Sequence, residues 1–237
     1  MRKISFMILV LVLIATITAC GNVSEPTNSV SSDAEEITKA SADASVAEEN
    51  EKTQNASFLI AYFTMPEDVD TEGIDANSGA SIVVEDGVIM ENVEYIAAII
   101  QQTIEGDLFQ IETTKTYLLD HEPLVDQAAE EQEENARPEL STHIENIDQY
   151  DTIFLGYPNW WGDMPMAVYS FLEEYDLSGK TIIPFCPHGG SGFSGTVWEI
   201  SNLQPNAQVS EDGLTISRND VADAKDEIVA WVQNLGF

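Results

Sequence analysis

The chain has 237 residues, of which 42 are acidic and nine are Lys or Arg, and its formal net charge is −33 at pH 7. Such an excess of negative charge repels phosphate backbones and anionic headgroups, so nucleic acid and an anionic lipid surface are excluded as partners. A solvated acidic surface or a basic protein partner remains consistent with it.

Residues 1–19 have the composition of an export signal. Arg2 and Lys3 precede an apolar run that ends at Ala19, shorter than the roughly 20 apolar residues of a membrane span. The small residues before Cys20 resemble the lipobox of bacterial lipoproteins, which implies cleavage before Cys20 and a lipid on its sulfur. An ordinary signal peptide with an incidental cysteine is the alternative. We expect an extracytoplasmic protein, lipid-anchored to the bacterial cell membrane.

Residues 20–56 are rich in Ser, Thr, Ala, Asn and Glu and show no apolar periodicity. This composition cannot bury enough surface to offset the entropy of ordering, so it predicts a flexible tether. Residues 57–237 have the length of one domain. Cys186 is the second of two cysteines, so a lipid on Cys20 leaves no intramolecular disulfide.

Strand-like apolar runs alternate with segments of helical period throughout residues 57–237. The expected strands are 57–63, 107–113, 151–158, 180–187 and 207–217. The expected helices are 92–106, a helix starting near 163, 195–203 and 219–237. This alternation predicts an α/β fold whose parallel sheet is covered on both faces.

Helix ends and insertions are also marked in the sequence. We expect Asn92 to cap the first helix and Gly106 to end it, and Asp163 to cap the next helix with Pro165 in its first turn. Residues 65–90 form an insertion with a hairpin turn at Asp86-Gly87. A second insertion, 115–150, contains a helix at about 123–135 that Pro138 ends.

Residues 190–195 read G-x-G-x-x-G, the glycine pattern of a dinucleotide-binding turn. That turn follows the first strand of its fold and is trailed by an acid about 20 residues later. Here the glycines follow the fourth expected strand, and the dinucleotide interpretation fails on position. A glycine loop at the carboxyl edge of a parallel sheet still lets backbone amides approach a ligand.

The companion loop is 156–166, at the end of the third expected strand, and it contains Trp160 and Trp161. Adjacent residues at a strand end point in different directions, and both rings are costly to expose. We expect one ring to be buried and the other to form a stacking wall. The alternative is that both pack in the core beneath the loop.

Residues 150–196 resemble the core of the flavodoxin-like family, in the branch with a WWG loop and an HGGSG loop, and 130–140 and 213–216 resemble the same branch. The resemblance implies an open, doubly wound, five-stranded parallel sheet in the order 2-1-3-4-5 that binds FMN. It places two sets of residues against the isoalloxazine: Pro158, Asn159, Trp160, Trp161 and Gly162 from one loop, and His188, Gly189, Gly190, Ser191 and Gly192 from the other.

The family's phosphate loop is S/T-x-T-G-N-T, and this chain departs from it. Thr64 fits the opening position, and Asn92 alone agrees in the segment 90–93, where the family has T-G-N-T. The insertion between them carries carboxylates, which repel a dianionic phosphate: Glu67, Asp68, Asp70, Glu72 and Asp75. Backbone amides at the helix start remain available to an anion in principle.

Three functions are consistent with these features. The first is an extracytoplasmic FMN electron carrier or FMN-dependent reductase with an unknown redox partner, in which no residue is needed as catalytic acid or base. The second is a non-redox binding lipoprotein with a degraded phosphate loop. The third is a hydrolase that uses Cys186 or Ser191. The histidines and acids lack the spacing of a metal site, and a homodimer is left open.

Overall fold

The structure is a computed structural model that describes residues 57–65, 67, 69–70, 72, 76–77, 79, 81–85 and 87–237. The predicted export signal, Cys20 and the predicted tether lie outside the described residues. Among the helices that are described, none has the length and apolarity needed to cross a bilayer.

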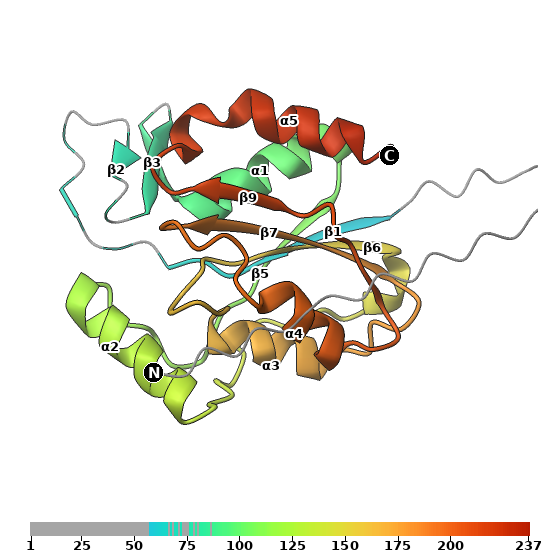
Figure 1. Cartoon of the computed structure of the whole chain (residues 1–237), viewed down its shortest axis with the longest axis horizontal. Helices are drawn as coiled ribbons and strands as arrows, with labels where there is room; N and C mark the ends of the chain where they lie inside the picture. The colour runs from blue at the N-terminus through green and yellow to red at the C-terminus, as the bar shows by residue number, and fades with distance from the viewer. Residues whose placement is uncertain are drawn as a thin grey trace, which may run out of the picture. The chain divides into compact units, whose positions relative to one another are not determined.

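A parallel sheet in the order β5-β1-β6-β7-β8 forms the centre of the domain, and β9 also pairs with β7 (Figure 1). In chain order this is 2-1-3-4-5, so the predicted doubly wound fold is confirmed. The strands are β1 (Phe58–Tyr62), β5 (Asp107–Gln110), β6 (Thr152–Gly156), β7 (Thr181–His188), β8 (Gln208–Val209) and β9 (Leu214–Ser217).

Helices cover both faces of this sheet, as Figure 1 shows. One face carries α1 (Asn92–Ile104) and α5 (Lys225–Asn234); the other carries α2 (His121–Glu133), α3 (Met166–Glu174) and α4 (Thr196–Leu203). Successive side chains of β1 alternate between the two cores: Leu59 and Ala61 pack towards α3, whereas Ile60 and Tyr62 pack towards α1. This alternation follows from the two-residue period of a strand. Two short 3-10 helices, Ile147–Gln149 and Val221–Asp223, complete the elements.

The fifth strand is divided, where the sequence predicted one strand over 207–217. Thr181 and Ile182 of β7 pair with β8, and the end of β7, from Phe185 to His188, pairs with β9. Between the two pieces, Gly213 lies against the carbonyl of Pro184. Proline has no N–H for the ladder, and the intervening residues 210–213, Ser-Glu-Asp-Gly, favour turns.

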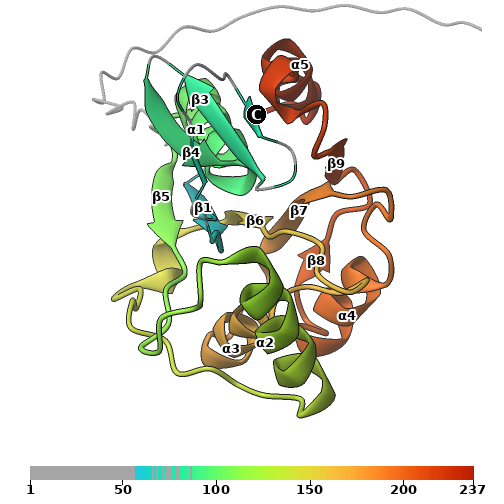
Figure 2. The ribbon, with the colours of Figure 1, turned by 90° about the vertical axis from the view of Figure 1, so that its left-hand side faces the viewer.

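The insertion after β1 contains a small antiparallel sheet, β2-β3-β4. Its strands are β2 (Ala76–Asn77), β3 (Ile82–Glu85) and β4 (Val88–Glu91). The predicted turn joins β3 to β4, and Gly87 takes a positive φ of 78° there. Figure 2 shows this hairpin beside α1, which begins directly after β4.

Two helix caps differ from the predicted ones. Glu91, not Asn92, is the N-cap of α1, and it forms a capping box with Glu94. Pro165, not Asp163, precedes α3; the Asp163 carboxylate instead accepts from the Met164 N–H and the Tyr169 hydroxyl. The end of α1 is close to the prediction, since Glu105 adopts the left-handed conformation just before Gly106.

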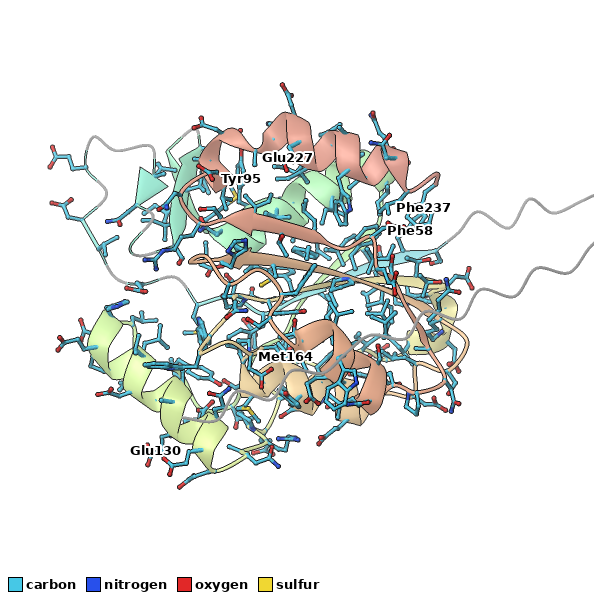
Figure 3. All side chains as sticks on the ribbon, viewed as in Figure 1. Phe58, Tyr95, Glu130, Met164, Glu227 and Phe237 are labelled. Carbon is cyan, nitrogen blue, oxygen red and sulfur yellow. The ribbon has the colours of Figure 1, made fainter. Side chains whose placement is uncertain are left out.

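The amino ends of the strands are closed by aromatic packing. Figure 3 shows Phe58, at the start of β1, beside Phe237 at the carboxyl terminus, with ring centroids 4.8 Å apart. The hairpin and α2 lie towards the opposite end of the sheet in Figure 1. The carboxyl ends of the strands are therefore the edge at which loops can form a site.

A substitution at Gly156 tests how tightly the carboxyl ends of the strands are packed. A Cβ on Gly156, the last residue of β6, would overlap the ring of Phe185 on β7. We expect Gly156→Ala to lower the free energy of unfolding by about 1–3 kcal/mol, as overpacking does. Gly195→Ala is the matched control, because a Cβ there meets no atom within 4 Å and φ is −96°. Urea unfolding measures both variants, and equal destabilisation would contradict the close approach.

Candidate functional site

A cavity of about 190 Å³ lies at the carboxyl ends of the strands, between the two loops that the sequence singled out. Six predicted residues belong to these loops or their flanks and line it: Pro158, Asn159, Trp160, Trp161, His188 and Gly189. It is also lined by residues from the insertion, α2, the end of β7 and the segment after β9: Glu67, Ser81, Glu91, His121, Leu124, Val125, Ala128, Pro187 and Arg218.

The two tryptophans have different surroundings. Trp160 is half-buried and stands edge-on to Phe63 and Tyr117, at centroid distances of 5.6 and 6.0 Å. Trp161 is 61 % exposed, and its indole N–H donates to the Val125 carbonyl at 3.1 Å. Its φ of 55° is unusual for a bulky residue. One ring therefore packs against the core and the other is held open to solvent, and both border the cavity.

Asn159 joins the two loops. Its side-chain N–H donates to the Gly192 carbonyl at 2.9 Å, and its side-chain oxygen accepts from the Gly162 N–H at 3.1 Å. Gly190 and Gly192 have φ of 128° and 58°, which only glycine adopts without strain. Gly162, Gly190, Ser191 and Gly192 are not among the cavity-lining residues. Gly162, Gly190 and Gly192 thus shape or hold the loops that line the cavity.

His188 and Cys186 do not form a nucleophilic pair. The Nδ1 of His188 accepts from the Gly190 N–H at 2.9 Å, and the thiol of Cys186 is buried against the Pro187 carbonyl. Burial raises the pKa of this thiol far above its usual range. Cys186 is therefore held as the unreactive thiol, and the hydrolase hypothesis loses one of its two nucleophiles.

Thr64 and Asn92, the residues assigned to the phosphate, do not line this cavity; Thr64 lines a separate one with Phe63 and Tyr117. Instead the Thr64 hydroxyl donates to the Glu91 carboxyl, which is 2 % exposed and does line it. The same oxygen of Glu91 accepts from the Val93 N–H at 2.9 Å. Burial raises the pKa of Glu91 to about 8, although the bonds from Thr64 and Val93 oppose this. The carboxyl is therefore mostly protonated at pH 7.

The amides at the start of α1 are already bonded within the chain. The Glu91 N–H donates to the Glu94 carboxylate, and the Asn92 N–H donates to the Ser81 carbonyl at 2.7 Å. With Val93 on Glu91, these three amides each have a protein acceptor. Among the described residues, the buried Asn92 Nδ2 is left without a partner. The aromatic and backbone groups of the two loops suit a flavin ring, whereas this helix start does not suit a flavin phosphate.

Sequence reasoning missed several residues of the cavity, among them Glu67, Glu91 and Arg218. Glu67, from the insertion, lies 3.1 Å from the Nδ1 of His121, so the insertion meets α2 beside the cavity. Arg218 follows β9; its N–H donates to the His188 carbonyl, and its guanidinium lies beside Gly189. Glu91 carried a recognisable signal, because its spacing from Glu94 matches a capping box with Glu in place of Ser or Thr. The structure describes no cluster of three or more His, Cys, Asp or Glu able to hold a metal ion.

Glu91 makes the stability of the fold depend on pH. Its carboxyl keeps a proton up to about pH 8 in the folded protein, against an ordinary value of 4.5. Between these values the folded state holds one more proton, so the Glu91 contribution to the free energy of unfolding falls as pH rises. Glu91→Gln keeps an acceptor and does not ionise. We expect it to gain stability over the wild type from about pH 5 to 8 in urea unfolding. A difference that does not change with pH would contradict the assignment.

Several solved structures have a similar fold. A protein from Bacteroides eggerthii described as a flavoprotein is 23% identical with a TM-score of 0.52, over 73% of this chain and 98% of that one. A second, from Bacteroides uniformis, is 24% identical with a TM-score of 0.52, over 71% and 96%. A Lactobacillus acidophilus flavoprotein in complex with FMN is 16% identical with a TM-score of 0.51, over 71% and 97%. No curated protein matches the chain.

A sequence profile of the flavodoxin family matches residues 82–235, from β3 to α5. The match spans well over half of the chain and includes both loops of the cavity. Its fold, in the strand order described above, agrees with the solved structures. The chain belongs to the flavodoxin family.

Proposed function

We propose that this protein binds FMN in the cavity between the WWG and HGGSG loops and uses it for electron transfer or for FMN-dependent reduction. The observation that carries the proposal is that residues 158–161 and 188–189, from two separate strand ends, line one cavity. Family membership and the FMN complex of a protein with a similar fold support the choice of ligand.

Each loop has a distinct part in this proposal. Trp160 and Trp161 offer an aromatic wall to a planar ring, and the backbone of the 188–192 loop offers amides to its polar edge. Asn159 holds the two loops in register with each other. A bound flavin would supply the redox chemistry, and the residues of this chain would position it and exclude water.

The charge of the protein would tune that chemistry. Glu67 lies at the cavity, and the chain carries a net charge of −33. Negative charge near the ring disfavours an anionic reduced flavin and so lowers its reduction potential. The redox partner that fits this surface is one with a basic face.

We also propose that the protein works outside the cytoplasm, held to the cell membrane by a lipid on Cys20. Residues 20–56 would then be a tether with an end-to-end distance of about 35 Å for a flexible chain. A domain on such a tether would reach partners in or on the membrane. A homodimer stays a prediction, to be tested by the mass in solution.

A second function is favoured by one observation. The start of α1 is closed by the chain's own acceptors, as expected of a non-redox binding lipoprotein that has kept the fold without the cofactor. Purification from the native membrane separates the two functions. Flavin in stoichiometric amount supports the first, and its complete absence, even after incubation with FMN, supports the second.

Trp161 tests the position of the ring. We expect Trp161→Ala to weaken flavin binding by about tenfold, because a stacked aromatic pair is lost. Trp198→Ala is the matched control: Trp198 is 66 % exposed and does not line the cavity, so its loss leaves the affinity unchanged. Titration of FMN fluorescence measures both. Equal affinities in the two variants would place the ring elsewhere.

A substitution at Cys20 tests whether the protein is anchored to the membrane. In the full chain, Cys20→Ser removes the acceptor for the lipid, so the protein is expected to move from the membrane fraction to the soluble fraction or to stay as an uncleaved precursor. Metabolic labelling with a fatty acid and cell fractionation measure the change. Labelling that persists in the variant would contradict the anchor.

A further inference from the structure

The carboxyl of Glu91 lies at the amino end of α1 and caps it. A helix start binds anions through free amides and the positive end of its dipole. In this chain the Val93 N–H and the Thr64 hydroxyl, from the helix and from the end of β1, both donate to one oxygen of Glu91. The carboxyl is 2 % exposed and lines the cavity.

The neighbouring backbone N–H donors also have acceptors within the chain. The carbonyl of Ser81, directly before the hairpin strand β3, accepts from the Asn92 N–H, and the Glu94 carboxylate accepts from the Glu91 N–H. A phosphate would have to replace these acceptors and then lie beside Glu67 and Glu91, two acids of the same cavity. The Asn92 Nδ2, a single side-chain donor, does not replace a set of amides.

The ring end of the cavity has no such obstacle. Trp160, Trp161, His188 and Gly189 line it, and none of these is acidic. Recognition of the ring and recognition of the phosphate are therefore separable in this chain. The groups that suit the ring are present, whereas the amides that suit a phosphate are occupied.

We propose that Glu91 takes the place of a ligand phosphate, so that the site recognises the uncharged part of a flavin and binds riboflavin as tightly as FMN. This inference rests on the proposed flavin site and narrows its ligand class to flavins with or without a phosphate. The proton that Glu91 retains near neutral pH is consistent with it, since a neutral carboxyl still accepts from Val93 and Thr64.

The first experiment compares the two flavins on the wild-type domain. Fluorescence titrations at pH 7 give the dissociation constants of riboflavin and FMN, and we expect them to agree within about threefold. FMN binding that is tighter by about tenfold or more would overturn this inference and leave the proposed function standing. Failure of both flavins to bind would overturn both.

Two variants at one position isolate the role of Glu91. Glu91→Gly removes the carboxyl and frees the Thr64 hydroxyl and the Val93 N–H, and glycine is tolerated at an N-cap. We expect it to raise the preference for FMN over riboflavin by about tenfold, as new charge-assisted bonds would. Glu91→Gln is the matched control, because its amide oxygen keeps both donors occupied and the preference stays near that of the wild type.

Circular dichroism confirms that each variant is folded before titration. A Glu91→Gly variant that folds and shows no gain in preference would contradict the role given to Glu91. If that variant does not fold, the wild-type comparison still decides the question. A gain in preference in the Glu91→Gln control would contradict the role given to Glu91, because its amide oxygen keeps both donors occupied.

Discussion

The in-register parallel pairing of β1, β6 and β7 is the constraint on which the site depends. Tyr62 pairs with Gly156, and Gly156 pairs with Phe185, so the three strands approach their carboxyl ends together. Parallel strands need helical crossovers, which direct their following loops to one edge. The absence of a side chain at Gly156 lets the Phe185 ring pack against the backbone of β6. The loops after β6 and β7 are thereby brought side by side, and Asn159 joins them.

At the same edge, the start of α1 has a different arrangement. Where an anion site would leave amides free, the chain supplies Ser81, Glu91 and Glu94 as internal acceptors for the start of α1. Such acceptors stabilise the helix without a ligand. The hairpin β3-β4 makes this arrangement possible, because the pairing of Ile82 with Glu91 brings Ser81, directly before β3, next to the end of β4. The acceptors that stabilise the start of α1 without a ligand are thus the groups that a phosphate would have to displace.

Much of the fold followed from periodicity and turn residues. The buried runs before Pro158 and Pro187 marked two central strands, and the Trp160-Trp161 pair was too apolar to be an ordinary loop. The divided fifth strand was missed because Pro184, which breaks the ladder, lies on a different strand. The place of Glu91 in the cavity was missed because glutamate side chains are usually exposed. Its burial depends on donors from Thr64 and Val93, which only the tertiary structure brings together.

A crystal structure of the domain soaked with FMN tests the central claim most directly. The account predicts the isoalloxazine between Trp161 and the 188–192 loop, with the Glu91 carboxyl still bonded to Thr64 and Val93 and the phosphate outside the start of α1. A phosphate seated on the Val93 N–H with Glu91 displaced, or a ring bound away from both loops, would contradict it.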